Sequence, residues 1–206
     1  EAQTFPVPFA LEETKENIIV NSNTSSKPSK EQIINQAFRF HSQGNLQEAA
    51  KYYQYFIDQG CNDHRVFSNY GIVLKGLGNL QEAELSYRKA IEINPDFIDA
   101  HSNLGNVLRD LGKLKEAELS TLKAIEIKPD FANAHSNLGN ILSDLGKLKE
   151  AELSYRKAIE IKADFAQAHS NLGIILKDLG KLKEAEISFR TAMQLNPHIA
   201  EVHSNL

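Results

Sequence analysis

The chain has 206 residues, of which 41% are hydrophobic and 24% are charged, and its net charge is −4 at pH 7. This composition is typical of a globular protein with enough apolar residues for a core. No apolar run approaches the roughly 20 residues of a membrane-spanning helix, and a nucleic-acid or anionic-membrane partner would favour a basic face. Cys61 is the only cysteine, so no internal disulfide forms, which fits a reducing compartment. We predict a cytoplasmic protein that binds neither nucleic acid nor membrane.

Residues 1–29 differ in composition from the rest of the chain. Pro6 and Pro8 interrupt any early helix, and residues 21–29 (NSNTSSKPS) are small and polar without periodicity. We predict a disordered tail or linker over 1–29. The alternative is that FPVPF, residues 5–9, is a short docking motif.

A 34-residue unit repeats along the remainder, residues 30–206. The segment HSNLGNILSDLGKLKEAELSYRKAIEIKADFAQA begins at His135, and close copies begin at His101 and His169. Periods of this length are typical of stacked units that bury their apolar faces against one another. The repeats are 30–63, 64–97, 98–131, 132–165 and 166–199, followed by a partial repeat at 200–206. The partial repeat stops inside an expected helix, which predicts that the chain is a fragment of a longer protein.

Each repeat contains the pattern of two helices. Apolar residues recur at helical spacing in each half, as Leu104 and Leu108 do in a first half. Gly112 then marks a short turn, so the two helices are expected to be antiparallel neighbours. Pro129 ends the second helix, because proline lacks the amide donor and clashes with the preceding turn.

The repeat at 30–63 is degenerate. Ser29 and Gln32 have the spacing of a capping box ahead of its first helix. Gln32 and Arg39 occupy positions 3 and 10, where the later repeats carry aliphatic residues that face the preceding repeat. Polar residues at these positions predict that this repeat is an N-terminal cap.

These features resemble the tetratricopeptide repeat (TPR) family. Its pattern has large residues at positions 4 and 11, Leu-Gly at 7–8, Gly at 15, Ala at 20 and 27, an aromatic at 24 and Pro at 32. The repeat 64–97 fills all nine positions, with Phe67, Tyr70, Gly71, Leu74, Gly78, Ala83, Tyr87, Ala90 and Pro95. Two departures elsewhere are Thr121 in place of the aromatic and Ala163 in place of the proline. The resemblance implies an all-α TPR solenoid, a right-handed superhelix of antiparallel helix pairs.

Histidines recur in register at position 4, as His101, His135, His169 and His203. Adjacent packed helices lie roughly 8–10 Å apart, whereas zinc ligands lie at about 2.0–2.1 Å. We therefore predict that these histidines fill packing space and hold no metal. The sequence contains no glycine-rich phosphate loop, Ser-His-Asp arrangement or CxxC pair. We predict a chain with no catalytic residues, no cofactor and no enzymatic activity.

The segment GKLKEAE alternates in charge along the second helix of several repeats. Lys113 with Glu116, and Lys115 with Glu118, have the spacing of helical ion pairs. This pattern predicts an ordinary solvated face.

An asparagine at position 6 recurs in every repeat, as Asn35, Asn69, Asn103, Asn137, Asn171 and Asn205. At about 100° per residue, position 6 lies nearly opposite the packing residues, on the same side as positions 2, 9 and 13. The TPR resemblance implies that this side lines a concave groove. Asparagine is a mediocre helix former, so propensity does not explain the ladder. Two interpretations stay open: a binding role in the groove, or a structural bond to a neighbouring helix preserved by duplication.

The ladder resembles the TPR arm of O-linked N-acetylglucosamine transferase, and this resemblance implies binding to the backbone of an extended polypeptide. TPR proteins that clamp carboxylates use cationic grooves. Here the cations Lys75, Arg109 and Lys177 stand beside the acids Asp110, Asp144 and Asp178. The mixture argues against a carboxylate clamp.

We predict a protein–protein interaction scaffold that binds an extended peptide in its concave groove. One alternative is the substrate-recruiting arm of a larger, glycosyltransferase-like enzyme, with a covalently attached catalytic domain beyond Leu206. The other is a structural spacer.

Overall fold

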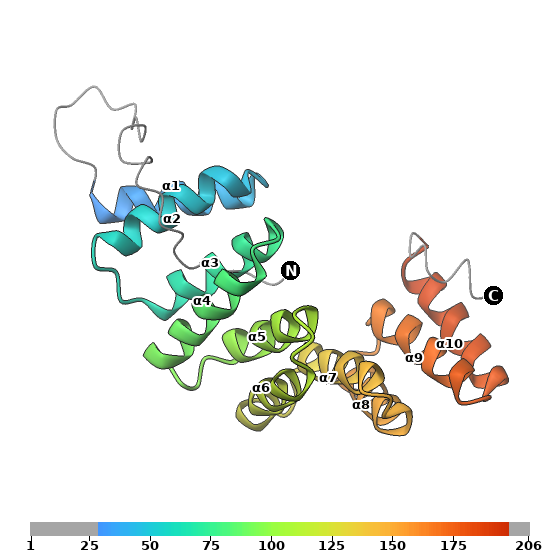
Figure 1. Ribbon diagram of the computed structural model, residues 1–206. Coiled ribbons are helices and arrows are strands. Elements are labelled where there is room, and N and C mark those ends of the chain that lie inside the picture. Colours follow the sequence, from blue (N-terminus) through green and yellow to red (C-terminus); the bar gives the residue numbers. More distant parts are fainter. Residues whose placement is uncertain (1–28, 198–206) are drawn as a thin grey trace. The chain divides into compact units, whose positions relative to one another are not determined.

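The computed structural model of the chain describes residues 29–197, which form ten α-helices and no strand. The predicted partial repeat, His203 and Asn205 lie outside this range, as does the predicted tail apart from Ser29. The all-α prediction is confirmed (Figure 1). The helices are α1 Lys30–Ser42, α2 Leu46–Asp58, α3 His64–Gly76, α4 Leu80–Ile93, α5 Ile98–Asp110, α6 Leu114–Ile127, α7 Ala132–Asp144, α8 Leu148–Ile161, α9 Ala166–Asp178 and α10 Leu182–Leu195.

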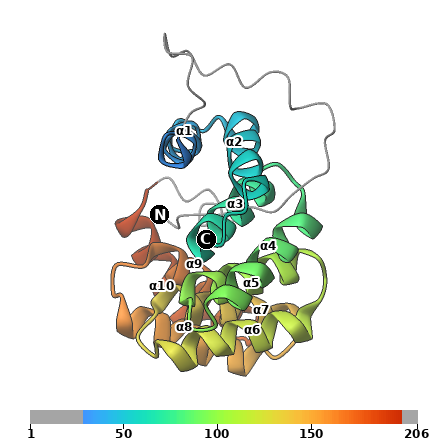
Figure 2. The same ribbon diagram turned by 90° about the vertical axis from the view of Figure 1, so that its left-hand side faces the viewer.

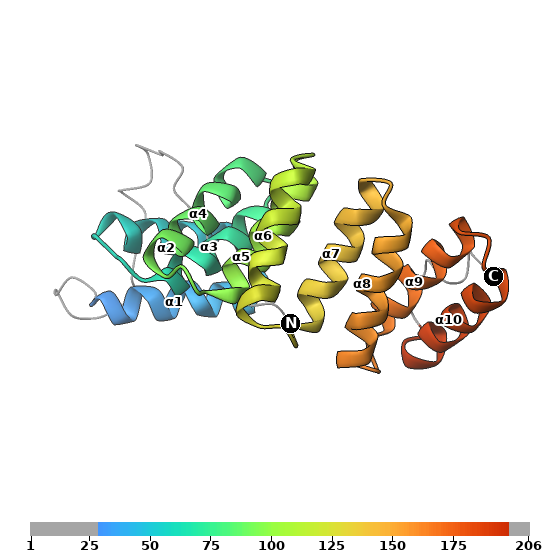
Figure 3. The same cartoon turned by 90° about the horizontal axis from the view of Figure 1, so that it is seen from below.

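The chain divides into two compact units, Glu1–Val107 and Leu108–Leu206, and the division falls inside α5. In the first unit, α1 packs on α2, α2 on α3, and α3 on α4; Figure 2 shows this end of the chain. In the second unit, α6 packs on α7, α7 on α8, α8 on α9, and α9 on α10; Figure 3 shows α7 beside α8 and α9 beside α10. Each unit is therefore built from consecutive helix pairs.

The turn inside each pair depends on the glycine at position 15. The glycines at 44, 78, 112, 146 and 180 have φ between 74° and 84°, in the left-handed region that glycine adopts without steric cost. At Gly146 the backbone N–H donates to the Ser143 carbonyl at 2.9 Å, and the next N–H, of Lys147, donates to the Leu142 carbonyl at 2.8 Å. The predicted short turn is thereby closed by hydrogen bonds.

The second helices end at equivalent residues with or without the proline of position 32. Helix α6 ends at Ile127, two residues before Pro129, and α8 ends at the equivalent Ile161, although Ala163 replaces the proline. The Lys162 N–H after α8 donates to the Ala158 carbonyl at 2.9 Å. The departure at position 163 therefore leaves the helix end unchanged.

The core of the second unit is organised by an aromatic ring that packs against a glycine. A Cβ atom on Gly139 of α7 would lie 2.6 Å from Tyr155 Cε1 of α8, and one on Gly173 of α9 would lie 2.6 Å from Phe189 Cε1 of α10. Both rings are almost fully buried. The glycine at position 8 and the aromatic at position 24 therefore require each other, because the ring fills the space that a side chain would need.

The first helix of the degenerate repeat has the predicted cap. The Ser29 N–H donates to Gln32 Oε1 at 2.9 Å, and the Gln32 N–H donates to Ser29 Oγ at 3.2 Å, which forms a capping box. Gln32 and Arg39 are exposed, whereas Val66 and Val73 at the same positions are 3% and 0% exposed. The role of this repeat as an end cap stays a prediction.

Candidate functional site

The asparagines of position 6 differ in burial from one repeat to the next. Asn35 on α1 is exposed, and Asn69 on α3 is only 3% exposed. Asn103 on α5, Asn137 on α7 and Asn171 on α9 are half-buried. The predicted ladder therefore consists of residues in different environments.

Asn69 is the least accessible of these asparagines. Its Oδ1 is buried and accepts no hydrogen bond from the residues that the structure describes. A buried acceptor without a partner costs free energy, and an atom without access to solvent does not reach a peptide unless neighbouring side chains move. The first unit thus offers a less direct binding surface at this position.

In the second unit, the asparagine of position 6 joins a hydrogen-bond network across three helices. Asn171 Nδ2 on α9 donates to Asn140 Oδ1 on α7 at 2.9 Å. The Tyr155 hydroxyl on α8 donates to the same Asn140 oxygen at 2.7 Å, and Gln167 Nε2 donates to Asn171 Oδ1 at 2.9 Å. Burial raises the pKa of the Tyr155 phenol, so the hydroxyl keeps its proton and acts as the donor. We call these four residues the amide network.

Sequence reasoning identified one member of the amide network, Asn171, as a site residue. Asn140 and Gln167 occupy positions 9 and 2, which helical periodicity already places on the same side as position 6. Their polar character was the signal that they belong to the same face. The hydroxyl of Tyr155 was not identified, because position 24 was assigned only to packing.

The network leaves a defined set of unused hydrogen-bonding groups. An asparagine amide has two N–H donors and an oxygen with two lone pairs. Asn171 uses one donor and one lone pair in these bonds, and it also interacts with the Tyr155 hydroxyl, so one lone pair of its oxygen remains. The Asn140 oxygen accepts two hydrogen bonds, so its capacity is filled and only its amide donors remain. Both side chains are half-buried, which leaves part of each accessible.

The cation predicted beside this face is paired with an acid of the next repeat. Arg109 Nε donates to Asp144 Oδ2 at 2.5 Å. This hydrogen bond raises the pKa of the Arg109 guanidinium. About a third of the Arg109 side chain and of the Asp144 side chain is exposed. The pairing supports the prediction that the face is not a carboxylate clamp, because the arginine charge is already balanced.

The prediction that the charged residues of the second helices form an ordinary solvated face is wrong in part. Glu118 and Glu152 at position 21 have side chains that are only 18% and 10% exposed. Each bonds a lysine of the following repeat: Lys147 Nζ lies 2.7 Å from Glu118, and Lys181 Nζ lies 2.8 Å from Glu152. The predicted contact of Lys115 with Glu118 is present but longer, at 3.9 Å. These two carboxylates therefore connect neighbouring repeats and are only slightly exposed to solvent.

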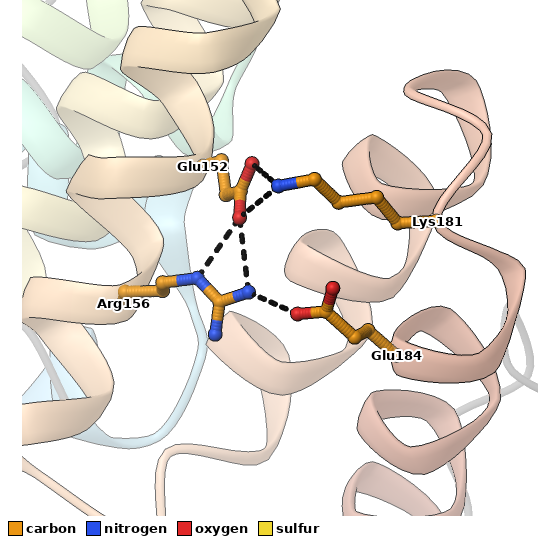
Figure 4. Close-up of polar contacts among 4 residues, drawn as sticks. All are labelled: Glu152, Arg156, Lys181 and Glu184. Atoms are coloured by element: carbon orange, nitrogen blue, oxygen red, sulfur yellow. Dashed lines mark hydrogen bonds and ion pairs between the residues drawn. The ribbon is translucent and has the colours of Figure 1, made fainter.

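The connection between α8 and α10 has additional charges. Arg156 Nη2 lies 2.9 Å from Glu152 and 2.6 Å from Glu184 of the next repeat (Figure 4). The hydrogen bond with Lys181 is the main reason that the pKa of Glu152 is lowered, and the hydrogen bond with Arg156 adds to it. We call Glu152, Arg156, Lys181 and Glu184 the inter-repeat clamp.

The described histidines of position 4, His101, His135 and His169, have a bonding role that the sequence did not predict. Each donates from Nε2 to a carbonyl oxygen six residues earlier, in the loop before its helix: His101 to Pro95 at 2.8 Å, His135 to Pro129 at 2.9 Å and His169 to Ala163 at 3.0 Å. A carbonyl only accepts, so Nε2 carries the proton. Within residues 29–197, no three His, Cys, Asp or Glu side chains gather in a way that would hold a metal ion. No helix of this range has the length and apolar character to cross a membrane.

Consecutive helix pairs with glycine turns and an aromatic–glycine core define a class of helical-repeat proteins that act as scaffolds. Family models for the TPR repeat match residues 71–112, 105–146 and 139–180, and one for the tetratricopeptide repeat matches 166–199. The chain belongs to the tetratricopeptide repeat family.

Solved structures agree with this fold. A MamA fragment from Desulfovibrio magneticus RS-1 aligns with a TM-score of 0.73 at 23% identity, over 85% of this chain and 99% of that one. The protein pilF of Pseudomonas aeruginosa aligns with a TM-score of 0.75 at 16% identity, over 84% and 79%. YrrB, described as a TPR protein with an unusual peptide-binding site, aligns with a TM-score of 0.66 at 22% identity, over 85% and 91%. A search of curated proteins found no match.

Proposed function

We propose that the chain is a non-catalytic scaffold that binds an extended peptide through the peptide backbone, on the face that carries the amide network. The observation that supports this proposal most directly is the set of unused groups on Asn171 and Asn140. The remaining lone pair of Asn171 matches the N–H of a peptide residue. The remaining donors of Asn140 match a peptide carbonyl.

The spacing of the helices fits an extended ligand. Packed helices lie roughly 8–10 Å apart, and an extended chain rises about 3.3 Å per residue. Equivalent groups on α7 and α9 therefore meet about every third peptide residue. Backbone contacts do not read side chains, so selectivity is loose. Each neutral hydrogen bond contributes only about 0.5–1.5 kcal/mol net, so several must act together.

The same asparagine also bonds a neighbouring helix, and the two roles are compatible. The bonds to Asn140 and Gln167 fix the orientation of the Asn171 amide. A fixed amide loses little conformational freedom when a ligand binds, which favours affinity. The structural bond thus prepares the group for binding. The solved structure of YrrB, a TPR protein described as having a peptide-binding site, gives a precedent within the fold.

The test is a peptide-library selection followed by backbone modification of the selected peptide. We expect N-methylation, which removes an amide donor, to weaken binding at about every third residue. Replacement of individual side chains is expected to change affinity little. Titration calorimetry with each modified peptide gives the pattern. A selected peptide that tolerates every N-methyl group would refute backbone recognition.

The matched protein variants are Asn171→Ala and Gln194→Ala. Both remove an amide, but Gln194 is exposed on the second-helix layer, on α10. We expect weaker peptide binding for Asn171→Ala and unchanged binding for Gln194→Ala. Thermal unfolding of both variants separates the roles of Asn171. If Asn171→Ala keeps its stability and its affinity, the amide network is not the binding surface.

A further inference from the structure

The carboxylate at position 13 has an arginine partner at one repeat boundary and lacks it at the next. Asp144 on α7 accepts a hydrogen bond from Arg109 of the preceding repeat at 2.5 Å. Asp178 on α9 is the equivalent of Asp144, and Ser143 stands in the place of the arginine. Among the residues that the structure describes, the exposed Asp178 side chain has no ion pair or hydrogen bond. The charge that is balanced on α7 is therefore left unbalanced on α9.

The cations nearest to Asp178 in the sequence do not replace the missing arginine. Lys177 precedes it on α9, and consecutive helical residues point about 100° apart, so the lysine leaves the helix on another side. Lys181 bonds Glu152 at 2.8 Å. Asp178 is also the last residue of α9, and the C-terminal end of a helix carries partial negative charge. The carboxylate and the helix end together favour a cationic ligand group.

Asp178 lies on the same side of α9 as the amide network. Asn171 and Asp178 are seven residues apart, which is nearly two helical turns and about 10.5 Å along the axis. Ile174 lies between them, about 4.5 Å from Asn171 along the axis, and is half-buried at the edge of the core. We call Asn171, Ile174 and Asp178 the α9 row. It presents an amide, an aliphatic side chain and a carboxylate in that order.

We propose that the α9 row selects one lysine or arginine in the extended peptide that the amide network binds, an inference that rests on the proposed function. The remaining lone pair of Asn171 accepts the N–H of a peptide residue. Successive side chains of an extended chain point in opposite directions, so one of two neighbouring peptide residues points toward Asp178. Lysine and arginine bury their aliphatic stems on apolar surface and keep the charged head in water. The stem then lies on Ile174 and the head reaches the Asp178 carboxylate.

The equivalent residues of α7 do not form such a row. Asn140 replaces the isoleucine, and its oxygen already accepts hydrogen bonds from Tyr155 and Asn171. Asp144 is balanced by Arg109. We therefore expect the preference for a basic side chain at one peptide position. The rest of the peptide is bound through its backbone and is selected loosely.

The probe is the peptide selected from the library, synthesised with lysine or norleucine at each position in turn. Norleucine keeps the aliphatic stem of lysine and lacks its charge. At one position we expect lysine to bind about fivefold more tightly, which corresponds to an exposed ion pair of about 1 kcal/mol. Added salt is expected to remove the difference, because salt screens exposed charges. Equal affinity for lysine and norleucine at every position would overturn the inference.

Three variants test whether Asp178 provides the charge. Asp178→Asn removes it, and Ser143→Arg supplies the guanidinium that Arg109 supplies to Asp144. We expect both variants to lose the preference for lysine over norleucine. Asp164→Asn is the matched control, because it removes an exposed carboxylate from the loop before α9 and should keep the fivefold preference. A preference that survives Asp178→Asn, or that Asp164→Asn also abolishes, would overturn the inference.

The N-methylation series separates this inference from the proposed function. If N-methyl groups weaken binding at about every third residue but no position prefers lysine, backbone binding stands and the side-chain selectivity is refuted. If every N-methyl group is tolerated while the preference for lysine depends on Asp178, the cation site stands and backbone recognition is refuted. A library that yields no binding peptide would refute both.

Discussion

Helices α6 and α8 have the same length, and their 14-residue sequences differ only at two adjacent positions. In α8 these are Tyr155 and Arg156, and in α6 they are Thr121 and Leu122. Tyr155 packs its ring on Gly139 and donates to the amide network, while Arg156 belongs to the inter-repeat clamp. Thr121 is fully buried, and its hydroxyl has no hydrogen-bond partner among residues 29–197.

The difference shows how one repeat acquires a role that its neighbour lacks. The residues that set the backbone, such as the turn glycines, are the same in both repeats. One substitution changes the core and the other changes the surface, and the helix itself is unaffected. In α8 both residues strengthen contacts with neighbouring helices. In α6 the same positions leave a buried hydroxyl and an exposed leucine.

The largest expected effect comes from making α8 resemble α6 in its core. Tyr155→Thr removes the ring from Gly139 and the hydroxyl from Asn140. Loss of a buried aromatic side chain typically costs about 3–5 kcal/mol, so we expect a decrease of about 3 kcal/mol in the free energy of unfolding, measured by urea denaturation. Tyr155→Phe is the control, because it keeps the ring and removes only one hydrogen bond, worth about 1 kcal/mol. Equal loss in both variants would mean that the hydroxyl, not the ring, stabilises this boundary.

A smaller effect is expected from the inter-repeat clamp. Glu152→Gln removes the charge that Lys181 and Arg156 share, and we expect a loss of about 1–2 kcal/mol at neutral pH, since hydrogen bonds to charged groups are worth about that much. Glu118→Gln is expected to cost less, because the Glu118 carboxylate has one close ionic contact, with Lys147, and its contact with Lys115 is longer. Urea denaturation measures the loss in both variants. A larger loss for Glu118→Gln than for Glu152→Gln would refute the comparison.

The contribution of Glu152 also has a defined pH dependence. Its pKa is lowered in the folded chain, chiefly by the hydrogen bond with Lys181. In the unfolded chain the Glu152 carboxyl titrates at about pH 4.3. The stabilisation is therefore complete above that value and disappears as the pH falls through the lower folded pKa. The parent and Glu152→Gln should differ most near neutral pH and converge under acidic conditions. A constant difference across this range would show that the charge of Glu152 is not responsible.

Much of this fold follows from the sequence, because its determinants are local. The left-handed turn at Gly146 and the capping box of Ser29 and Gln32 depend on residues within a few positions of each other. The pairing of Gly139 with Tyr155 follows from the repeat pattern. Helical periodicity also placed Asn171 and Asn140 on one face.

The contacts that sequence reasoning missed connect different repeats. Lys147 and Glu118 are 29 residues apart, and periodicity within one helix does not tell which side chain reaches across a boundary. The interpretation of the charged segment as a solvated face failed for this reason. Only the relative placement of the helices showed that Glu152 is covered and bonded to Lys181. The asparagine at position 69 was likewise counted as a groove residue, although packing buries it.

The smallest expected effect on stability comes from restoring the arginine to α6. Leu122→Arg places a guanidinium where Arg156 stands in α8, opposite Glu150, and an exposed pair of this kind contributes about 0.2–1 kcal/mol. We expect a slight gain in the free energy of unfolding at low salt and none at high salt, because salt screens the pair. Leu122→Gln, which removes the leucine without adding a charge, is expected to leave the stability unchanged in both conditions. Urea denaturation at the two salt concentrations makes the comparison. Because the leucine is 43% exposed, its loss should cost little packing. A large destabilisation in both variants would show that Leu122 is a core residue.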